Sequence, residues 1–300
     1  MLGNLRISRN RSYSLPESLG FLLLRVFLLS LFPFYFLLQL LLFLLILLFA
    51  APTIVTAIVW GLLLAISAYE LLYTTGLVRE ARLVVYAAVM AFAVVLWSHL
   101  GSIHAFGLLG VMLFVGVLFA EMMFSHIKIT FDKICLCIMA GLVIPFLLGS
   151  LVRILALSRI GRYMIPIPFI VAFGSDAGAY FAGRFFGHHK LAPVISQHKT
   201  IEGVIGGVGA SVILMLLYGL ILQLAFSFRV NYGYAIVYGL TGALAGVFGD
   251  LCFSVVKRQT GIKDYGKLIP GHDGVLDRFD SMMMVGPLME ALLILIPMAV

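Results

Sequence analysis

The chain has 300 residues, of which 63% are hydrophobic and only 11% are charged, and its mean hydropathy is +1.14. A soluble domain of this length cannot bury so much apolar surface in one core, so the composition excludes a soluble protein and predicts that lipid is the solvent. The net charge of +7 suits membrane lipids or nucleotides, although much of it follows from topology, and we expect no nucleic-acid partner.

Apolar segments of spanning length follow one another along the chain, and we count about nine of them. They predict an all-α fold, a polytopic integral membrane helical bundle of about nine transmembrane helices. The first span contains Pro33 and is long for one crossing, so it is either kinked or two short segments. The predicted spans lie near Phe21–Phe49, Thr53–Thr74, Leu83–Leu100, Ala105–Phe124, Ile134–Leu151, Met164–Phe186, Gly203–Phe226, Gly233–Val256 and Met282–Val300.

Positive charge in the connections sets the predicted orientation. With the N-terminus in the cytoplasm, the charged segments around 79–82, 128–133, 184–199 and 257–278 all face the cytoplasm. Arg153, with Arg159 and Arg162, breaks this pattern. The arginine-bearing start also resembles a signal peptide, but its apolar run is too long, which favours an uncleaved first span.

The chain divides by character. Residues 1–160 are mainly structural spans, whereas glycine and charge concentrate in 173–281, which we predict to carry the catalytic constellation and its cytoplasmic loops. No linker separates the two parts, so we predict a single membrane domain over 1–300. Isolated glutamates such as Glu70 and Glu121 are more often hydrogen-bonded interfacial residues than catalysts. Small residues spaced for close helix contact are Gly203, Gly207, Gly242 and Gly246.

The first polar cluster is Gly174–Arg184. On a helix, Asp176, Tyr180 and Arg184 recur every four residues and share one face, which is typical of a lined cavity. A structural Asp–Arg pair between helices is the alternative interpretation.

The second cluster, Lys190–Gly203, is a polar run with Pro193, and we expect a cytoplasmic loop that leads into the next span. Its helix-start amides, together with Lys199 and the hydroxyls of Ser196 and Thr200, could receive a phosphate. Taken alone, the segment is also compatible with an ordinary basic loop.

The third cluster, Gly249–Ser281, carries the most specific signal. Asp250, Ser254 and Lys257 fall on one helical face, and Asp277 and Asp280 are spaced to share another. Convergent carboxylates suit a hard divalent cation such as Mg²⁺, which completes its coordination shell with water and substrate phosphates.

The same cluster supplies cations for phosphate oxygens. A solvated cytoplasmic loop would explain these cations but not the aspartates. Gly261 to Lys267 matches most of a P-loop, yet Leu268 stands where Ser or Thr must bind Mg²⁺, which excludes that reading. The cationic residues are Lys257, Arg258, Lys263, Lys267, His272 and Arg278.

These residues resemble the signature of the phosphatidate cytidylyltransferases, the CDP-diacylglycerol synthases. The resemblance lies in S-x-x-K-R-x₄-K-D, P-G-H and G-x-L-D-R-x-D-S between Ser254 and Ser281, and in D-x-G-A-Y from Asp176 to Tyr180. The chain departs from the family at Asp273, where a glycine is usual, and at Gln197–His198, where Pro-Gly is usual.

The resemblance implies a reaction in which CTP and phosphatidic acid give CDP-diacylglycerol and pyrophosphate in phospholipid biosynthesis. It also implies a dimeric helical membrane enzyme, hence a homodimer, in a bacterial-type cytoplasmic (inner) membrane with its active site facing the cytoplasm. The implied cofactor is Mg²⁺, with a second cation left open. Its implied ligands are Asp250, Asp277 and Asp280.

Roles follow for the remaining residues. We expect Asp250, Lys257, Asp277 and Asp280 to be catalytic, because charge stabilisation dominates a transfer between two phosphate compounds. The expected substrate-binding residues are Asp176, Lys199, Ser254, Arg258, Lys263, Asp264, His272 and Arg278.

Two other functions remain open. A CTP-dependent polyprenol or lipid kinase would share the phosphate chemistry but transfer a γ-phosphoryl group. A cation-coupled transporter would use Asp176 and Asp250 to bind its ion, and it predicts inverted repeats that the uneven charge distribution does not suggest.

Overall fold

The structure is a computed structural model that describes residues 52–101, 104–125, 128–157, 160–266 and 274–299. The described residues all belong to one compact unit, Leu45–Val300. The predicted span Phe21–Phe49 lies outside the described residues. The elements in chain order are α2 (Thr53–Tyr69), the π-helical turn η1 (Glu70–Thr74), α3 (Ala81–Leu100), α4 (His104–Phe124), α5 (Phe131–Ile138), the π-helical turn η2 (Met139–Val143), α6 (Ile144–Leu148), α7 (Ser150–Leu155), α8 (Gly161–Met164), α9 (Pro166–Phe186), β1 (Lys190–Ala192), β2 (Ser196–Thr200), α10 (Ile201–Phe226), α11 (Tyr232–Thr260), the 3₁₀ turn η3 (Leu276–Arg278) and α12 (Met282–Leu295).

Within the described ranges, seven helical segments are long and apolar enough to cross a membrane, which confirms the prediction of an all-α polytopic bundle. One of them is composite, because α5, η2, α6 and α7 follow one another from Phe131 to Leu155. The predicted span Met282–Val300 is instead the 14-residue helix α12. It ends at Leu295 because Pro297 disfavours a helical conformation at Ile296, whose φ is −138°.

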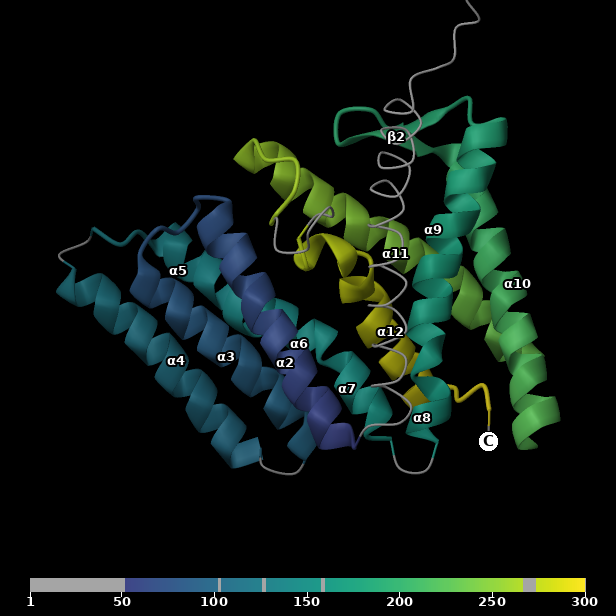
Figure 1. The fold of residues 1–300 in the computed structure, drawn as a ribbon, viewed down its shortest axis with the longest axis horizontal. Helices are drawn as coiled ribbons and strands as arrows, with labels where there is room; N and C mark the ends of the chain where they lie inside the picture. Colours follow the sequence, from purple (N-terminus) through teal and green to yellow (C-terminus); the bar gives the residue numbers. More distant parts are fainter. Residues whose placement is uncertain (1–51, 102–103, 126–127, 158–159, 267–273, 300) are drawn as a thin grey trace, which may run out of the picture. The chain divides into compact units, whose positions relative to one another are not determined.

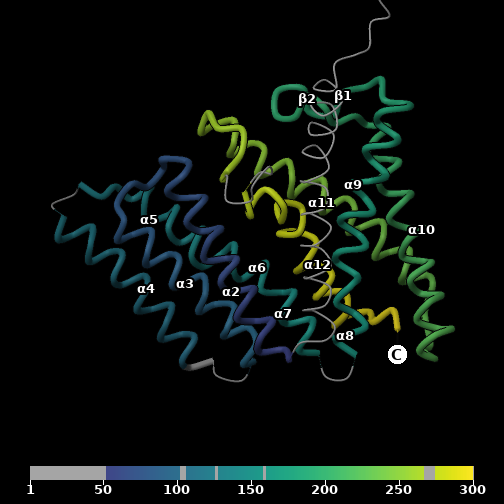
Figure 2. Tube along the Cα trace, in the orientation of Figure 1, coloured from purple at the N-terminus to yellow at the C-terminus, as the bar shows by residue number. Residues whose placement is uncertain are grey.

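Helix α12 joins two groups of helices (Figures 1 and 2). It contacts α6 and α7, which pack with α2 and α3, and it also contacts α9 and α11, which pack with α10. Glycines bring these helices close. A Cβ added to Gly207 would lie 2.7 Å from the carbonyl oxygen of Ser175, and one added to Gly242 would lie 2.5 Å from Val171 Cγ1. The predicted helix packing at these glycines is therefore confirmed.

Arg153 breaks the loop-charge pattern because it is an internal ion-pair partner. Its guanidinium forms a bidentate pair with Glu290 on α12, at 2.7 Å from Nε to Oε1 and 2.8 Å from Nη2 to Oε2. Its Nη1 also donates to Ser98 Oγ on α3 at 3.1 Å. The charge is thus satisfied between α3, α7 and α12.

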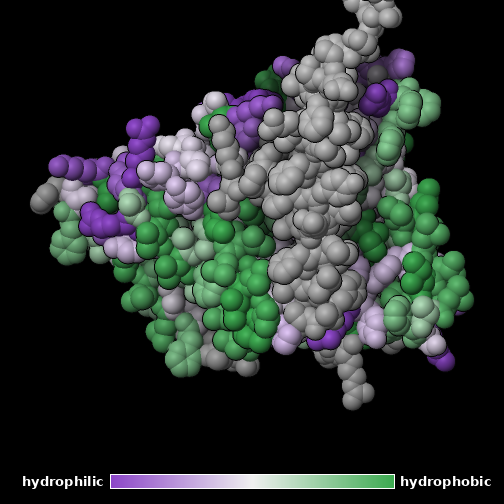
Figure 3. Space-filling model, in the orientation of Figure 1, coloured by the Kyte–Doolittle hydropathy of each residue, from purple (hydrophilic) through white to green (hydrophobic). Residues whose placement is uncertain are grey.

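The polar surface gathers at one end of the bundle. The segments predicted to be cytoplasmic, at the α2–α3, α4–α5 and α9–α10 connections and the end of α11, lie at the same end in Figure 1. In Figure 3 hydrophilic side chains gather there, whereas the sides of the helices are hydrophobic. The segment predicted as a loop at 190–200 forms an antiparallel hairpin at this end, with Lys190 opposite Thr200.

Candidate active site

The C-terminal half of α11 carries the predicted polar face. Asp250 and Ser254 lie one turn apart, and Ser254 Oγ donates a hydrogen bond to Asp250 Oδ1 at 3.2 Å. A Cβ on the neighbouring Gly249 would lie 2.8 Å from the carbonyl oxygen of Asp280. The helix therefore lies directly against the backbone that precedes α12, and this contact brings Asp250 near Asp280.

The β1–β2 hairpin contributes a cation to the same place. Lys199 Nζ, at the end of β2, lies 2.5 Å from Asp250 Oδ2, and both side chains are partly exposed. Arg258 Nε donates to the carbonyl oxygen of Ile195 at 3.1 Å, which fastens the tip of the hairpin to the end of α11. Two predicted substrate-binding residues, Lys199 and Arg258, thus lie beside the predicted catalytic face.

Asp277 is fully engaged by its surroundings. Its Oδ1 accepts from Lys257 Nζ at 3.0 Å, and its Oδ2 accepts from the amides of Tyr265 at 2.8 Å and Gly274 at 3.1 Å. The side chain is only 5% exposed. Asp277 therefore orients Lys257 and closes the loop between α11 and η3.

Asp280 lies at the start of α12, where its Oδ1 accepts from the amide of Ser281 at 2.7 Å. The pKa of Asp280 is raised to about 7, first by burial and then by the negative charge of Asp250, with a further contribution from Asp176. The Ser281 amide and the charge of Lys257 act in the opposite direction. Three carboxylates from α9, α11 and the α12 start thus repel one another.

The prediction that Asp250, Asp277 and Asp280 bind a metal ion together stays a prediction. No group of three His, Cys, Asp or Glu side chains in the described ranges is arranged to hold a metal ion. Asp277 lies in a single 3₁₀ turn, after which Phe279 has φ −118°, and Asp280 lies beyond that turn. The two carboxylates therefore do not share a helical face.

The other predicted residues are spread around this centre. Asp176 is exposed on α9. Arg184 Nη1 donates a hydrogen bond to the Tyr180 hydroxyl at 2.7 Å, which confirms that Tyr180 and Arg184 share one face of α9. Lys263 is exposed, whereas Asp264 and Arg278 are partly exposed. His272 lies outside the described residues.

The start of α10 carries local hydrogen bonds in the segment predicted to receive a phosphate. Thr200 Oγ1 accepts a hydrogen bond from the amide of Gly203 at 3.1 Å and caps the helix. The carboxylate of Glu202 accepts from the amides of His188 and His189, each at 3.2 Å. The Gly203 amide is thus capped by Thr200, and the salt bridge of Lys199 with Asp250 connects this segment to the centre.

The sequence pattern that defines the cytidylyltransferase family matches residues 34–296. The chain belongs to the cytidylyltransferase family. It is similar to proteins named phosphatidate cytidylyltransferase from Staphylococcus saprophyticus (42% identity over 134 residues), Staphylococcus haemolyticus (43% over 134 residues) and Staphylococcus aureus strain COL (45% over 136 residues). Each matched stretch covers 45% of this chain and 50% of the relative, so the chain spans about half the length of these relatives.

In this family member Asp250 and Asp280 are the residues that would hold a hard divalent cation. The pKa of Asp280 is raised by burial and then by the negative charge of Asp250, and a cation would offset that charge. Mg²⁺ is commonly bound by one or two carboxylates and completes its coordination with water and phosphates. We assign Asp277 instead to holding Lys257, because its side chain is only 5% exposed and accepts from Lys257 and two amides, whereas the Asp250 side chain is 30% exposed.

Two further features of this family member bear on the site. Glu70, expected at an interface, is buried and accepts from the amide of Leu276 at 3.1 Å. No local pattern could reveal this contact, because the partners are 206 residues apart.

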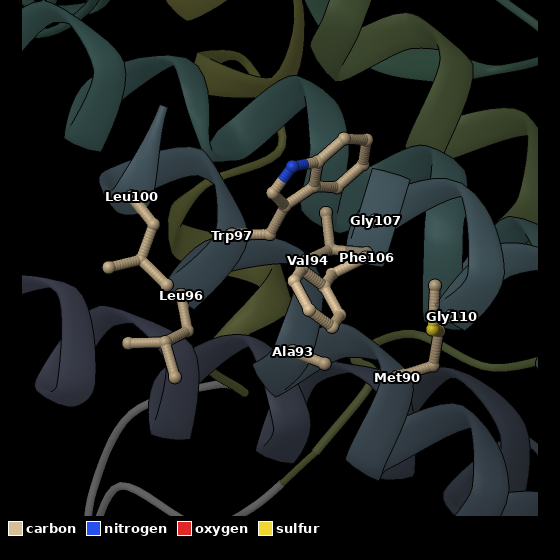
Figure 4. A pocket seen from close by; sticks show the side chains of 9 residues that line it. All are labelled: Met90, Ala93, Val94, Leu96, Trp97, Leu100, Phe106, Gly107 and Gly110. Carbon is tan, nitrogen blue, oxygen red and sulfur yellow. The ribbon is translucent and has the colours of Figure 1, made fainter. Parts of the chain in front are cut away.

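A cavity of about 190 Å³ lies between α3 and α4 (Figure 4), but its lining contains no ionisable side chain, so it does not carry the chemistry.

Proposed function

We propose that this protein transfers the cytidylyl group of CTP to phosphatidic acid at the polar end of the bundle. A phosphate oxygen of phosphatidic acid attacks the α-phosphorus of CTP, the bond from that phosphorus to the bridging oxygen breaks, and pyrophosphate leaves. CDP-diacylglycerol is the product. The observation that carries the proposal is a group of aspartates and lysines from α9, β2, α11 and the α12 start, gathered at one end of an apolar bundle in a cytidylyltransferase.

The physical demands of this reaction match that group. The nucleophile is already an anion, so no strong general base is needed. The barrier lies in bringing two polyanions together and stabilising charge on the leaving group, so positioned cations dominate catalysis. Lys199 and Lys257 are held in place by Asp250 and Asp277, which keeps both ammonium groups oriented before substrate enters.

Asp250 and Asp280 are the residues that would hold Mg²⁺. When bound, the cation supplies positive charge to the phosphates of CTP. Ser254 supports Asp250, and Arg258 and Arg278 add positive charge near the hairpin and η3. Lys263, Asp264 and His272 belong to the segment that we assign to the nucleotide, and Asp176 borders the space where the lipid headgroup enters.

The setting follows from the same proposal. A lipid substrate reaches the site laterally from the membrane, and CTP comes from the cytoplasm, so the polar end faces the cytoplasm of a bacterial-type inner membrane. The loop charges support this orientation, since Lys and Arg concentrate in the connections at that end. We further propose that the enzyme acts as a homodimer.

Two labels on CTP test the reaction and separate it from a lipid kinase. Purified protein receives phosphatidic acid, a polyprenol as the acceptor for the rival kinase, Mg²⁺ and CTP labelled at either the α- or the γ-phosphorus. We expect labelled lipid from α-labelled CTP and labelled pyrophosphate from γ-labelled CTP. Lipid labelled only from γ-labelled CTP would identify a kinase, and no labelled lipid from either would refute both.

A matched pair of variants ties the activity to the site. Asp280→Asn removes one charge from the proposed cation site, whereas Asp132→Asn makes the same change at an exposed position in the first turn of α5. We expect the first to abolish most transfer and the second to leave it unchanged. Equal activities in the two variants would contradict the proposed site.

A further inference from the structure

Glu70 is a carboxylate buried at the end of an apolar span. It begins η1 and is only 2% exposed. A buried carboxylate is costly unless other groups donate hydrogen bonds to it or carry opposite charge. It forms no salt bridge with any residue in the described ranges, so its stabilisation comes from the backbone that packs against it.

That backbone is the loop between α11 and η3. The amide of Leu276 donates to Glu70 Oε2 at 3.1 Å. A Cβ on Gly266 would lie 2.2 Å from Oε1, and one on Gly274 would lie 2.7 Å from Oε2. The loop backbone therefore touches the carboxylate on both sides, and these two contacts leave no room for a side chain larger than that of glycine.

The π-helical turn adds a second attachment. Thr74, the last residue of η1, contacts the carbonyl oxygen of Tyr265 through its hydroxyl. Glu70 and Thr74 thus both engage the same loop from one turn of helix. Such π-helical turns are frequent at functional positions, because the extra residue redirects side chains that an α-helix would present elsewhere.

The loop residues held by η1 are those that hold Asp277. The amides of Tyr265 and Gly274 both donate to Asp277 Oδ2, and Asp277 Oδ1 accepts from Lys257. The contacts therefore run from Glu70 through the loop backbone to Asp277 and then to Lys257. In the described ranges no hydrogen bond or ion pair joins Glu70 directly to Lys257, Asp250 or Asp280, so its effect on the reacting centre passes through the loop.

We propose that Glu70 is a positioning residue of the active site. Its carboxylate clamps the loop backbone at Gly266 and at Gly274–Leu276, so that the loop amides hold Asp277 and Asp277 holds Lys257. Its effect on turnover rests on the proposed function, whereas its effect on the loop does not. The clamp explains why a long apolar span ends in a buried acid.

Hydrogen–deuterium exchange on the full chain in lipid nanodiscs tests the clamp without reference to catalysis. In Glu70→Ala we expect the amides of Tyr265, Gly274 and Leu276 to exchange at least about tenfold faster, because their acceptors or supports are lost. Glu70→Gln keeps an oxygen for Leu276 and should exchange like the wild type. Unchanged exchange at these amides in folded Glu70→Ala would overturn the proposal.

Kinetics test the consequence for the site. Glu70→Ala should lower kcat by about 10- to 100-fold, with KM for phosphatidic acid nearly unchanged, because a displaced Lys257 loses alignment rather than lipid affinity. Glu70→Gln should retain most of the activity. The control is Glu121→Ala, which removes a carboxylate bonded to Arg82 and Tyr86 at the end of α4 and should leave kcat unchanged.

The two arms separate failure of the clamp from failure of the proposed reaction. If the wild type forms no cytidylylated lipid, the proposed function fails, while the exchange result still decides whether Glu70 holds the loop. If the wild type is active and Glu70→Ala matches it in kcat, the positioning role is refuted.

A substitution on the loop side gives an independent test that does not require Glu70→Ala to fold. Gly266→Ala places a methyl group against the carboxylate and should speed exchange at Gly274 and lower kcat. The control is Gly209→Ala on α10, where a new Cβ meets nothing within 4 Å. In a Glu70→Ala background Gly266→Ala should add little, since coupled residues are not additive. A full additional loss in the double variant would contradict the clamp.

Discussion

The two groups of helices on either side of α12 use charge differently. In the α2–α7 group two acids, Glu80 and Glu121, each meet one base across a helix pair. Glu80 lies 2.5 Å from Lys133, and Glu121 lies 3.2 Å from Arg82. In each pair one cation balances one carboxylate, and the pair connects neighbouring helices.

In the α9–α12 group the carboxylates outnumber the lysines that meet them. Lys199 and Lys257 form pairs with Asp250 and Asp277, but Asp280 forms no salt bridge in the described part of the chain. Its pKa is raised first by burial and then by the charges of Asp250 and Asp176, against the opposing charge of Lys257. Balanced pairs hold helices together, whereas an uncompensated carboxylate marks a place suited to an additional cation.

The largest effect should follow from removing a carboxylate of the unbalanced group. Asp250→Asn deprives Lys199 of its partner and removes a proposed cation ligand, so we expect cytidylyl transfer to fall by about 1,000-fold. Transfer of α-label from CTP to lipid measures this. The corresponding change in the other group, Glu121→Gln, should leave transfer within about twofold, since an exposed pair contributes little. Similar losses in both variants would erase the contrast between the groups.

The next effect separates cation ligand from positioning acid. Asp280→Asn should raise the Mg²⁺ concentration needed for half-maximal activity by about tenfold or more, whereas Asp277→Asn should lower kcat with little change in that concentration. Titration of activity with Mg²⁺ in each variant distinguishes them. A shift in Mg²⁺ requirement for Asp277→Asn as large as that for Asp280→Asn would restore Asp277 as a ligand.

Metal removal tests the same contrast by stability. Chelation should lower the thermal unfolding midpoint of the wild type, because a bound cation stabilises the folded state by mass action. The midpoint of Asp280→Asn should respond less. Thermal unfolding in detergent, with and without Mg²⁺, gives the measurement, and equal responses of the two proteins would argue against a site at Asp280.

Breaking the pair that joins the two groups should affect stability rather than chemistry. Glu290→Gln leaves Arg153 without its bidentate partner, and we expect a loss of about 3 kcal/mol of unfolding free energy. Activity per folded molecule should persist. A folded Glu290→Gln protein with wild-type stability but impaired turnover would place this pair with the active site instead.

The smallest effect should come from an exposed balanced pair. Lys133 lowers the pKa of Glu80 below its ordinary value of 4.5 through a side-chain hydrogen bond. The depressed pKa means that the stabilising contribution is present above pH 4.5 and is lost as the pH falls through the lowered pKa. Because both side chains are about one-third exposed, Glu80→Gln should cost about 0.5 kcal/mol or less at neutral pH, as measured by thermal unfolding.

The spans and their close packing could be predicted because both depend on local features. Lipid requires continuous apolar helices, and glycine spacing such as Gly203 and Gly207 directly reports helix contact. The face of Asp250 and Ser254 was predictable for the same reason, since it lies within one regular helix. These features need only the period of the helix and the thickness of the bilayer.

The rest depended on contacts between distant segments. Asp277 lies in a single 3₁₀ turn and Asp280 lies beyond it, which helical spacing does not reveal. The pairing of Lys199 with Asp250 and the contact of Glu70 with Leu276 join residues from separate elements. Periodicity says which residues share one helix face, but not which faces meet.

The contact between Lys199 and Asp250 has a consequence for how an anion enters. At 2.5 Å the ammonium already has a counterion, so an arriving triphosphate must exchange places with a carboxylate instead of meeting a bare charge. Lys199 therefore keeps an ionic partner throughout the exchange, and leaving its charge unpaired would be costly. Under the proposed function, nucleotide affinity would be the difference between two ionic contacts, and the exchange would free Asp250 to hold a cation that arrives with the phosphates.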